Sequence, residues 1–124
     1  MNDSKKYDLE ERLVKFAVII TSLAESLPET YVGKYITGQL IRSGISPALN
    51  YGEAKSAESM NDFIHKMKIS LKELRETFIS IKIIKEKPLV KNNDLLMNCY
   101  NECNELISIF VKSIQTAETN RKNK

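Results

Sequence analysis

The sequence predicts an all-α fold, an antiparallel up-down-up-down bundle of four long helices. Four segments place apolar residues three or four positions apart, the spacing that gathers them on one face of a helix. Only four glycines and three prolines interrupt 124 residues, and the connections are short, which makes consecutive helices antiparallel neighbours. With 42% hydrophobic residues the chain suits one domain over residues 1–124, with a core over about 7–117 and a flexible polar tail over 118–124.

The first two helices are predicted over about residues 7–27 and 31–54. The first carries an amphipathic stripe of Leu9, Leu13, Phe16, Ile20, Ala24 and Leu27. Pro28 ends this helix, because the residue before a proline is driven out of the helical region. Along the apolar side of the second helix lie Ile36, Leu40, Pro47 and Tyr51. Pro47 removes one helical hydrogen bond at a cost of about 3 kcal/mol, and since the periodicity continues on both sides we expect a kink rather than a break.

The third and fourth helices are predicted over about residues 59–85 and 92–119. Ser59 followed by Asp62 resembles a capping box, and Asn92 or Asn93 provides a good cap for the last helix. The third helix has a near-heptad stripe of Met60, Phe63, Met67, Leu71, Leu74, Phe78 and Ile81. Pro88 follows its end. The stripe of the fourth helix is Leu96, Cys99, Cys103, Leu106, Phe110 and Ile114.

Composition and motifs narrow the function classes. The formal net charge of +3 permits nucleic-acid binding but does not argue for it. No apolar stretch approaches the roughly 20 residues of a membrane span, so we expect a cytoplasmic protein. Cys99 and Cys103 are four apart on an apolar stripe with no second pair of zinc ligands, which favours core packing. His65 is the only histidine, and no phosphate loop or catalytic triad is present. We therefore predict no enzyme, no catalytic residue, no cofactor and no metal.

Polar residues recur at helical spacing within the second and third helices. This polar seam comprises Gln39, Arg42, Ser46, Asn50, Glu53, Ser70, Glu73 and Glu76. Antiparallel packing of the two helices places Arg42 within reach of Glu73 or Glu76. A metal site using these carboxylates and His65 is the alternative, but His65 has no glutamate three residues before it, as di-iron bundles require. Pairing that sets helix register or a subunit contact is the better interpretation.

Two surfaces are candidates for binding partners. An apolar line on the second helix, away from its core stripe, predicts contact with another subunit: Tyr31, Tyr35, Ile41, Ile45 and Leu49. A basic line on the third helix, together with the end of the chain, predicts contact with RNA or DNA: Lys68, Lys72, Arg75, Lys82, Arg121, Lys122 and Lys124. A solvated helix face with pairs such as Lys72 and Glu76 is the alternative interpretation of the basic line.

The central block resembles a bacterial four-helix-bundle family whose first members are encoded in intervening sequences of 23S rRNA genes. The pattern is QL-x-RS, then N-x-x-E, a serine-containing turn, a phenylalanine and an E-x-x-E ending. Matching residues are Gln39, Leu40, Arg42, Ser43, Ser46, Asn50, Glu53, Ser59, Phe63, Leu71, Glu73 and Glu76. The resemblance implies a homopentamer. Related members are accessory proteins of diversity-generating retroelements, which implies nucleic acid or a nucleic-acid-processing protein as a partner, whereas many others stand alone with no known function.

Overall fold

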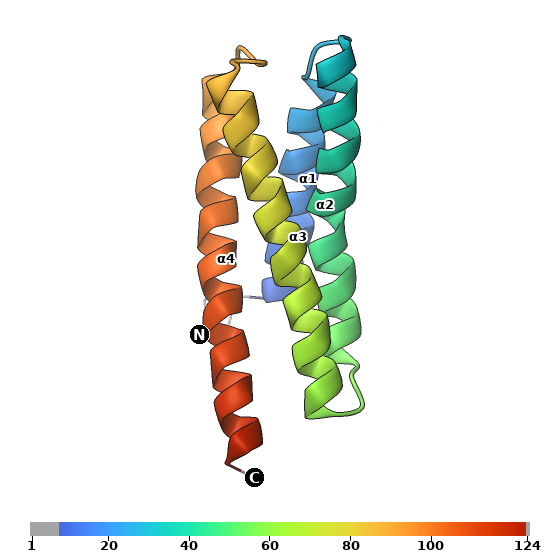
Figure 1. Cartoon of the computed structure of the whole chain (residues 1–124), viewed down its shortest axis with the longest axis vertical. Coiled ribbons are helices and arrows are strands. Elements are labelled where there is room, and N and C mark those ends of the chain that lie inside the picture. The colour runs from blue at the N-terminus through green and yellow to red at the C-terminus, as the bar shows by residue number, and fades with distance from the viewer. Residues whose placement is uncertain (1–7, 124) are drawn as a thin grey trace.

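A computed structural model describes residues 8–123 and confirms the four-helix fold. The helices are α1 (Leu9–Glu25), α2 (Tyr31–Lys55), α3 (Met60–Glu86) and α4 (Asn93–Lys122). They run alternately up and down (Figure 1). Each of α1 and α3 packs against α2 and α4, so α1 and α3 lie on opposite corners of the bundle, as do α2 and α4. The predicted start of the first helix at Tyr7 lies outside the described residues.

Each helix begins at the polar cap that local chemistry favours. The side chains of Asp8, Thr30, Ser59 and Asn92 accept hydrogen bonds from backbone N–H groups in the first turns of α1, α2, α3 and α4. The Ser59 Oγ lies 3.0 Å from the backbone nitrogen of Asp62, which confirms that cap. Such caps satisfy donors that have no partner inside the helix, and they set where each helix starts.

The core contains most of the stripes predicted for the first and last helices, and it shifts that of the third, in which Met67, Leu74 and Ile81 are buried as predicted. Met60 is 38% exposed, and Phe63, Leu71 and Phe78 are only partly buried. These residues lie toward the α4 side of α3, where the Phe78 and Tyr100 rings are 4.9 Å apart. The face of α3 directed into the bundle instead carries Ile64, Met67, Ser70, Leu74, Thr77, Ile81 and Ile84. Apolar spacing alone identified three of these residues and missed the other four, two of which are hydroxyl residues.

The hydroxyl groups of Ser70 and Thr77 can be buried at little cost, because each donates a hydrogen bond to an acceptor inside the bundle. Thr77 Oγ1 donates to Glu73 O at 2.9 Å and lies 2.8 Å from Ser43 Oγ of α2, while Ser70 Oγ donates to the carbonyl of Pro47 at 3.2 Å. α2 runs unbroken through the buried Pro47, so the helix does not split there. The kink itself stays a prediction.

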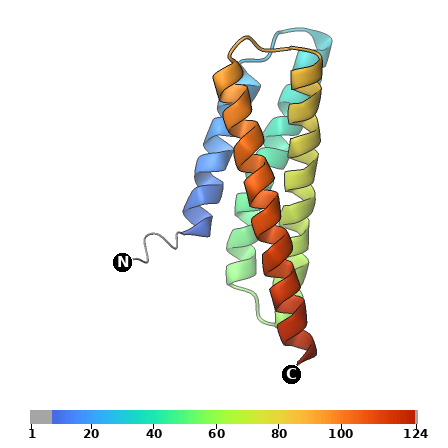
Figure 2. The same ribbon diagram turned by 90° about the vertical axis from the view of Figure 1, so that its left-hand side faces the viewer.

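The last helix extends further than the sequence indicated. α4 continues to Lys122 instead of ending near Thr119. In Figures 1 and 2, the first turns of α3 and the last turns of α4 project beyond the start of α1, and they lie beside each other. Glu118 pairs with Lys68 of α3 at 3.0 Å, and Arg121 donates to the side chain of Asn61 at 2.9 Å. These contacts stabilise the helix over residues that composition alone indicates to be frayed.

Candidate functional site

The polar seam lies where α2 and α3 meet, and Arg42 is its centre. Its guanidinium donates to Glu73 Oε1 at 2.8 Å, to Glu76 Oε1 at 2.7 Å and to Gln39 Oε1 at 3.0 Å. The pairing expected from the sequence is therefore formed, and with both glutamates at once. The hydrogen bond that Arg42 donates to Glu76, together with the charges of both glutamates, raises the pKa of Arg42, although desolvation by burial opposes this. Glu73 retains only 10% of its side-chain exposure, so this carboxylate depends on Arg42 for its partner.

The other seam residues pair locally. Asn50 Nδ2 donates to Ser46 Oγ at 2.9 Å within α2, and Glu53 accepts from Lys66 Nζ of α3 at 2.6 Å. Every carboxylate of the seam thus faces a cation. Within residues 8–123 no group of three or more histidine, cysteine, aspartate or glutamate side chains is placed to hold a metal ion. The arrangement joins two helices in one register and offers no pair of groups poised for proton transfer or nucleophilic attack.

A second arginine joins α1 to α4 in the same manner. The Arg12 guanidinium donates twice to Glu102, at 2.6 and 3.0 Å, and once to Glu105. These hydrogen bonds, that to Glu102 above all, raise the pKa of Arg12. Each arginine pairs with two glutamates that lie three positions apart and therefore share one helix face. These are Glu73 and Glu76 for Arg42, and Glu102 and Glu105 for Arg12. The sequence did not predict the Arg12 contact, because no feature of the sequence near Arg12 shows which residue of α4 faces it.

Cys99 and Cys103 are core residues, as predicted. Both are fully buried, and their Sγ atoms lie 3.6 Å from the carbonyl of Ile19 and 3.3 Å from that of Leu74. Burial raises the pKa of each thiol to about 12. Neither cysteine therefore forms a thiolate at neutral pH, the form that nucleophilic and metal-binding chemistry needs.

The apolar line of α2 is the most exposed apolar surface of the described chain. Tyr31 is 89% exposed, Tyr35 65%, Leu49 63% and Ile41 38%, whereas Ile45 is partly buried. Across residues 8–123, ten large apolar side chains are exposed, and five of them belong to α2. Only four of its 25 residues are charged, against ten of the 27 in α3. A solvated helix face is normally polar, so this one is poorly suited to remain in water.

The basic line of α3 is exposed, and some of its members already have partners within the chain. Lys68 pairs with Glu118, Arg121 with Asn61, and Lys82 lies 4.8 Å from the centre of the Phe78 ring. The remaining described members, Lys72, Arg75 and Lys122, are also exposed, while Lys124 lies outside the described residues. A shallow groove of about 420 Å³ is lined by Lys68, Leu71, Lys72, Arg75, Glu76 and Ile79. Glu76 contacts Arg42 across the helix interface rather than forming the intrahelical pair with Lys72.

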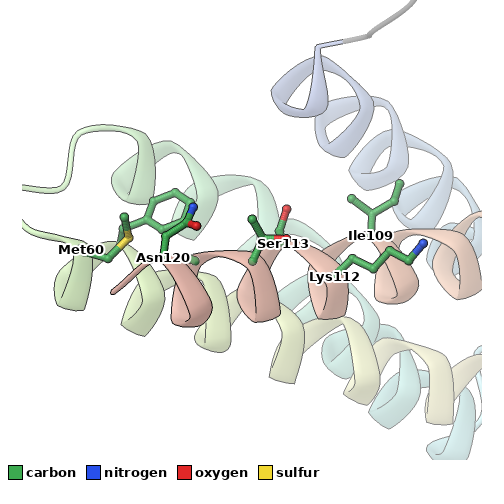
Figure 3. A pocket seen from close by; sticks show the side chains of 8 residues that line it. Met60, Ile109, Lys112, Ser113 and Asn120 are labelled. Atoms are coloured by element: carbon green, nitrogen blue, oxygen red, sulfur yellow. The ribbon is translucent and has the colours of Figure 1, made fainter. Parts of the chain in front are cut away.

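A second groove, of about 490 Å³, opens between the start of α3 and the end of α4, beyond the reach of α1 (Figure 3). Met60, Phe63 and Ile109 give it apolar walls, and Lys112 and Asn120 lie at its rim. Sequence reasoning did not predict it, because it arises from the difference in length between α1 and its neighbours.

No helix within residues 8–123 is both long and apolar enough to span a bilayer.

Comparison with known proteins identifies the family. The chain resembles a crystal structure of a protein of unknown function from the S23 ribosomal protein family of Bacteroides thetaiotaomicron VPI-5482. The two share 27% sequence identity and a TM-score of 0.78 over 86% of this chain and 98% of the other. No curated protein matches the chain. The model of the 23S rRNA-intervening sequence protein family matches residues 5–112, and the chain belongs to that family.

Proposed function

We propose that this protein is a non-enzymatic helical module that assembles with copies of itself through the outer face of α2. The observation that carries the proposal is the exposure of Tyr31, Tyr35 and Leu49 on one line of a helix that has few charges. Exposed tyrosines are among the residues that contribute most to protein interfaces. The family resemblance makes five the first number of copies to test, and the cytoplasm remains the expected location.

The described residues of the polar seam form no arrangement suited to catalysis, and this supports the non-enzymatic part of the proposal. Arg42 pairs with both Glu73 and Glu76, and the buried thiols are held in their neutral form. Groups arranged in this way set the register of packed helices, which is what a subunit of an assembly requires.

Leu49→Lys should abolish or strongly weaken self-assembly without unfolding the protein. Leu49 is 63% exposed, so the lysine is solvated in a single copy, but in an assembled copy its charge would be buried without a partner. The measurement is light scattering coupled to size exclusion, with circular dichroism to verify helix content. Ile79→Lys is the matched control, because Ile79 is 54% exposed on α3 and should leave the assembly intact. An unchanged mass for Leu49→Lys would contradict the proposed surface.

Nucleic-acid binding is a second candidate, favoured by the convergence of Lys68, Lys72 and Arg75 on the groove of α3. If the groove binds phosphates, affinity for short RNA or DNA oligonucleotides should fall steeply as salt is raised. Lys72→Glu combined with Arg75→Glu should then remove binding, with Lys15→Glu on α1 as the control. Absence of any gel shift at low salt in the unaltered protein rejects this candidate and leaves self-assembly untouched.

A further inference from the structure

The outer face of α3 carries two isoleucines that the fold leaves largely in water. Ile79 is 54% exposed, and Ile83, one turn further along the helix, is 45% exposed. The face that α3 directs into the bundle is formed by other residues, among them Leu74, Thr77 and Ile81. A solvated helix face is normally polar, and isoleucine is a weaker helix former than lysine or glutamate. Packing within one copy therefore gives no reason for the two exposed isoleucines.

Ile79 joins two shallow grooves into one track along α3. The groove of about 420 Å³ reaches Ile79 from the side of Lys72 and Arg75. A further groove of about 580 Å³ continues from Ile79 toward the end of the helix. We define the outer stripe of α3 as six exposed residues along this track: Lys72, Arg75, Ile79, Lys82, Ile83 and Lys87. The outer stripe is about 23 Å long, or roughly four helical turns.

The charge of the outer stripe is positive and has little compensation. Four of its six residues are cations, and within residues 8–123 none of the four forms an ion pair with a carboxylate. Two glutamates also line the grooves. Glu76 is already paired with Arg42 of α2 at 2.7 Å, so of the two only Glu86 opposes the cations. The outer stripe therefore offers two apolar contacts in surroundings that attract anions.

We propose that the outer stripe of α3 is the docking surface for an acidic amphipathic helix of another protein. A helix that docks in a groove uses apolar residues three, four and seven positions apart. The two grooves follow one another along α3, so a single helix laid beside α3 reaches both. Its apolar face contacts Ile79 and Ile83, and its flanking carboxylates meet the lysines and Arg75. This inference goes beyond the proposed self-assembly, which uses the outer face of α2.

Other occupants fit the outer stripe less well. A second copy of the same stripe would bring its four cations opposite like charges, which opposes binding. A nucleic acid would use the cations but not the isoleucines, and none of the six residues is an aromatic that stacks on bases. Binding to an anionic membrane increases with the apolar area that is buried, and two isoleucines supply little. An acidic amphipathic helix uses both the charges and the apolar residues.

The probe for this surface is a fluorescent peptide of about 18 residues made of glutamate, alanine and leucine, with its leucines three and four positions apart. Alone it should be largely unfolded, because short helices are marginal in water and its glutamates repel one another. Binding to the full chain should raise its fluorescence anisotropy, and the helical circular dichroism of the mixture should exceed the sum of its parts. A scrambled peptide of the same composition should bind at least about tenfold more weakly.

Variants of the full chain separate the apolar part of the contact from the charged part. Ile79→Ala should raise the dissociation constant of the acidic peptide about tenfold, because it removes the apolar contact that both grooves share. Val18→Ala on α1, at a site that is 57% exposed, is the matched control and should leave binding unchanged. Lys72→Glu combined with Arg75→Glu should abolish binding, since the peptide would then face carboxylates. Alanine and glutamate are good helix formers, so these variants should stay folded, which circular dichroism verifies.

The same titrations with a single-stranded DNA oligonucleotide and with phosphatidylserine vesicles separate the other occupants. Peptide binding that is weakened by Ile79→Ala and kept by Val18→Ala supports the inference. Absence of peptide binding up to about 1 mM overturns it, as does equal binding of the scrambled peptide, or binding of DNA or vesicles without the peptide. A smaller mass for Ile79→Ala than for the unaltered protein in light scattering also overturns it, because the outer stripe would then join copies of this chain.

Discussion

Arg42→Ala should lower the free energy of unfolding by about 1–3 kcal/mol, the effect of leaving a buried polar group without its partner. Arg42 itself is half exposed, at 51% of its side chain, so its own Coulomb attraction is screened and contributes little. The loss arises at Glu73, whose carboxylate is 10% exposed and would lose the cation that pairs with it. Urea denaturation followed by circular dichroism measures the change.

Lys15→Ala provides the control for this prediction. Lys15 pairs with Glu11 at 3.6 Å, with both side chains largely exposed, and its removal should change stability by less than about 0.5 kcal/mol. Arg42→Ala should also weaken self-assembly, because Glu73 and Glu76 would lose their cation beside the outer face of α2. A stability for Arg42→Ala equal to that of Lys15→Ala would show that the polar seam is not structural.

Gly44→Ala and Gly38→Ala should change the stability of the single copy in opposite directions. At Gly44 the new Cβ would overlap Ile20, a fully buried β-branched residue that has little freedom to move, and overpacking of this kind costs about 1–3 kcal/mol. At Gly38 the new Cβ would meet nothing, so the higher helix propensity of alanine should stabilise the chain by up to about 1 kcal/mol.

Thermal denaturation at low protein concentration compares the stabilities of the two variants under conditions in which copies do not assemble. The melting temperature should fall for Gly44→Ala and rise for Gly38→Ala. A fall for both variants would mean that Gly38 serves the fold of the single copy, although its own packing leaves room for a methyl group there. A rise for both would mean that α1 and α2 can separate enough to accept a methyl group at Gly44.

Most of the fold could be predicted from the sequence because its signals are local. Apolar spacing in the first and last helices identified buried residues such as Leu13, Phe16 and Phe110. Cap residues located the helix starts, as Ser59 did. The pairing of Arg42 with Glu73 and Glu76 followed once the second and third helices were placed antiparallel across a short turn.

The remaining features depend on contacts between distant parts of the chain. Thr77 is buried because Ser43, 34 residues away, approaches its hydroxyl, and no apolar pattern marks such a residue. The contact of Arg12 with Glu102 requires the register of the first helix against the last. The different roles of Gly44 and Gly38 appear only when the space beside each one is known. The sequence pattern of a helix shows which of its residues are buried, but it does not show which other helix packs against them.

Light scattering of the unaltered protein over a wide concentration range tests the central claim that the outer face of α2 joins copies of this chain. We expect a mass above the 14.2 kDa of one copy at about 100 µM, decreasing on dilution, and a mass near that of one copy for Leu49→Lys under the same conditions. A mass of one copy for the unaltered protein throughout this range would contradict it.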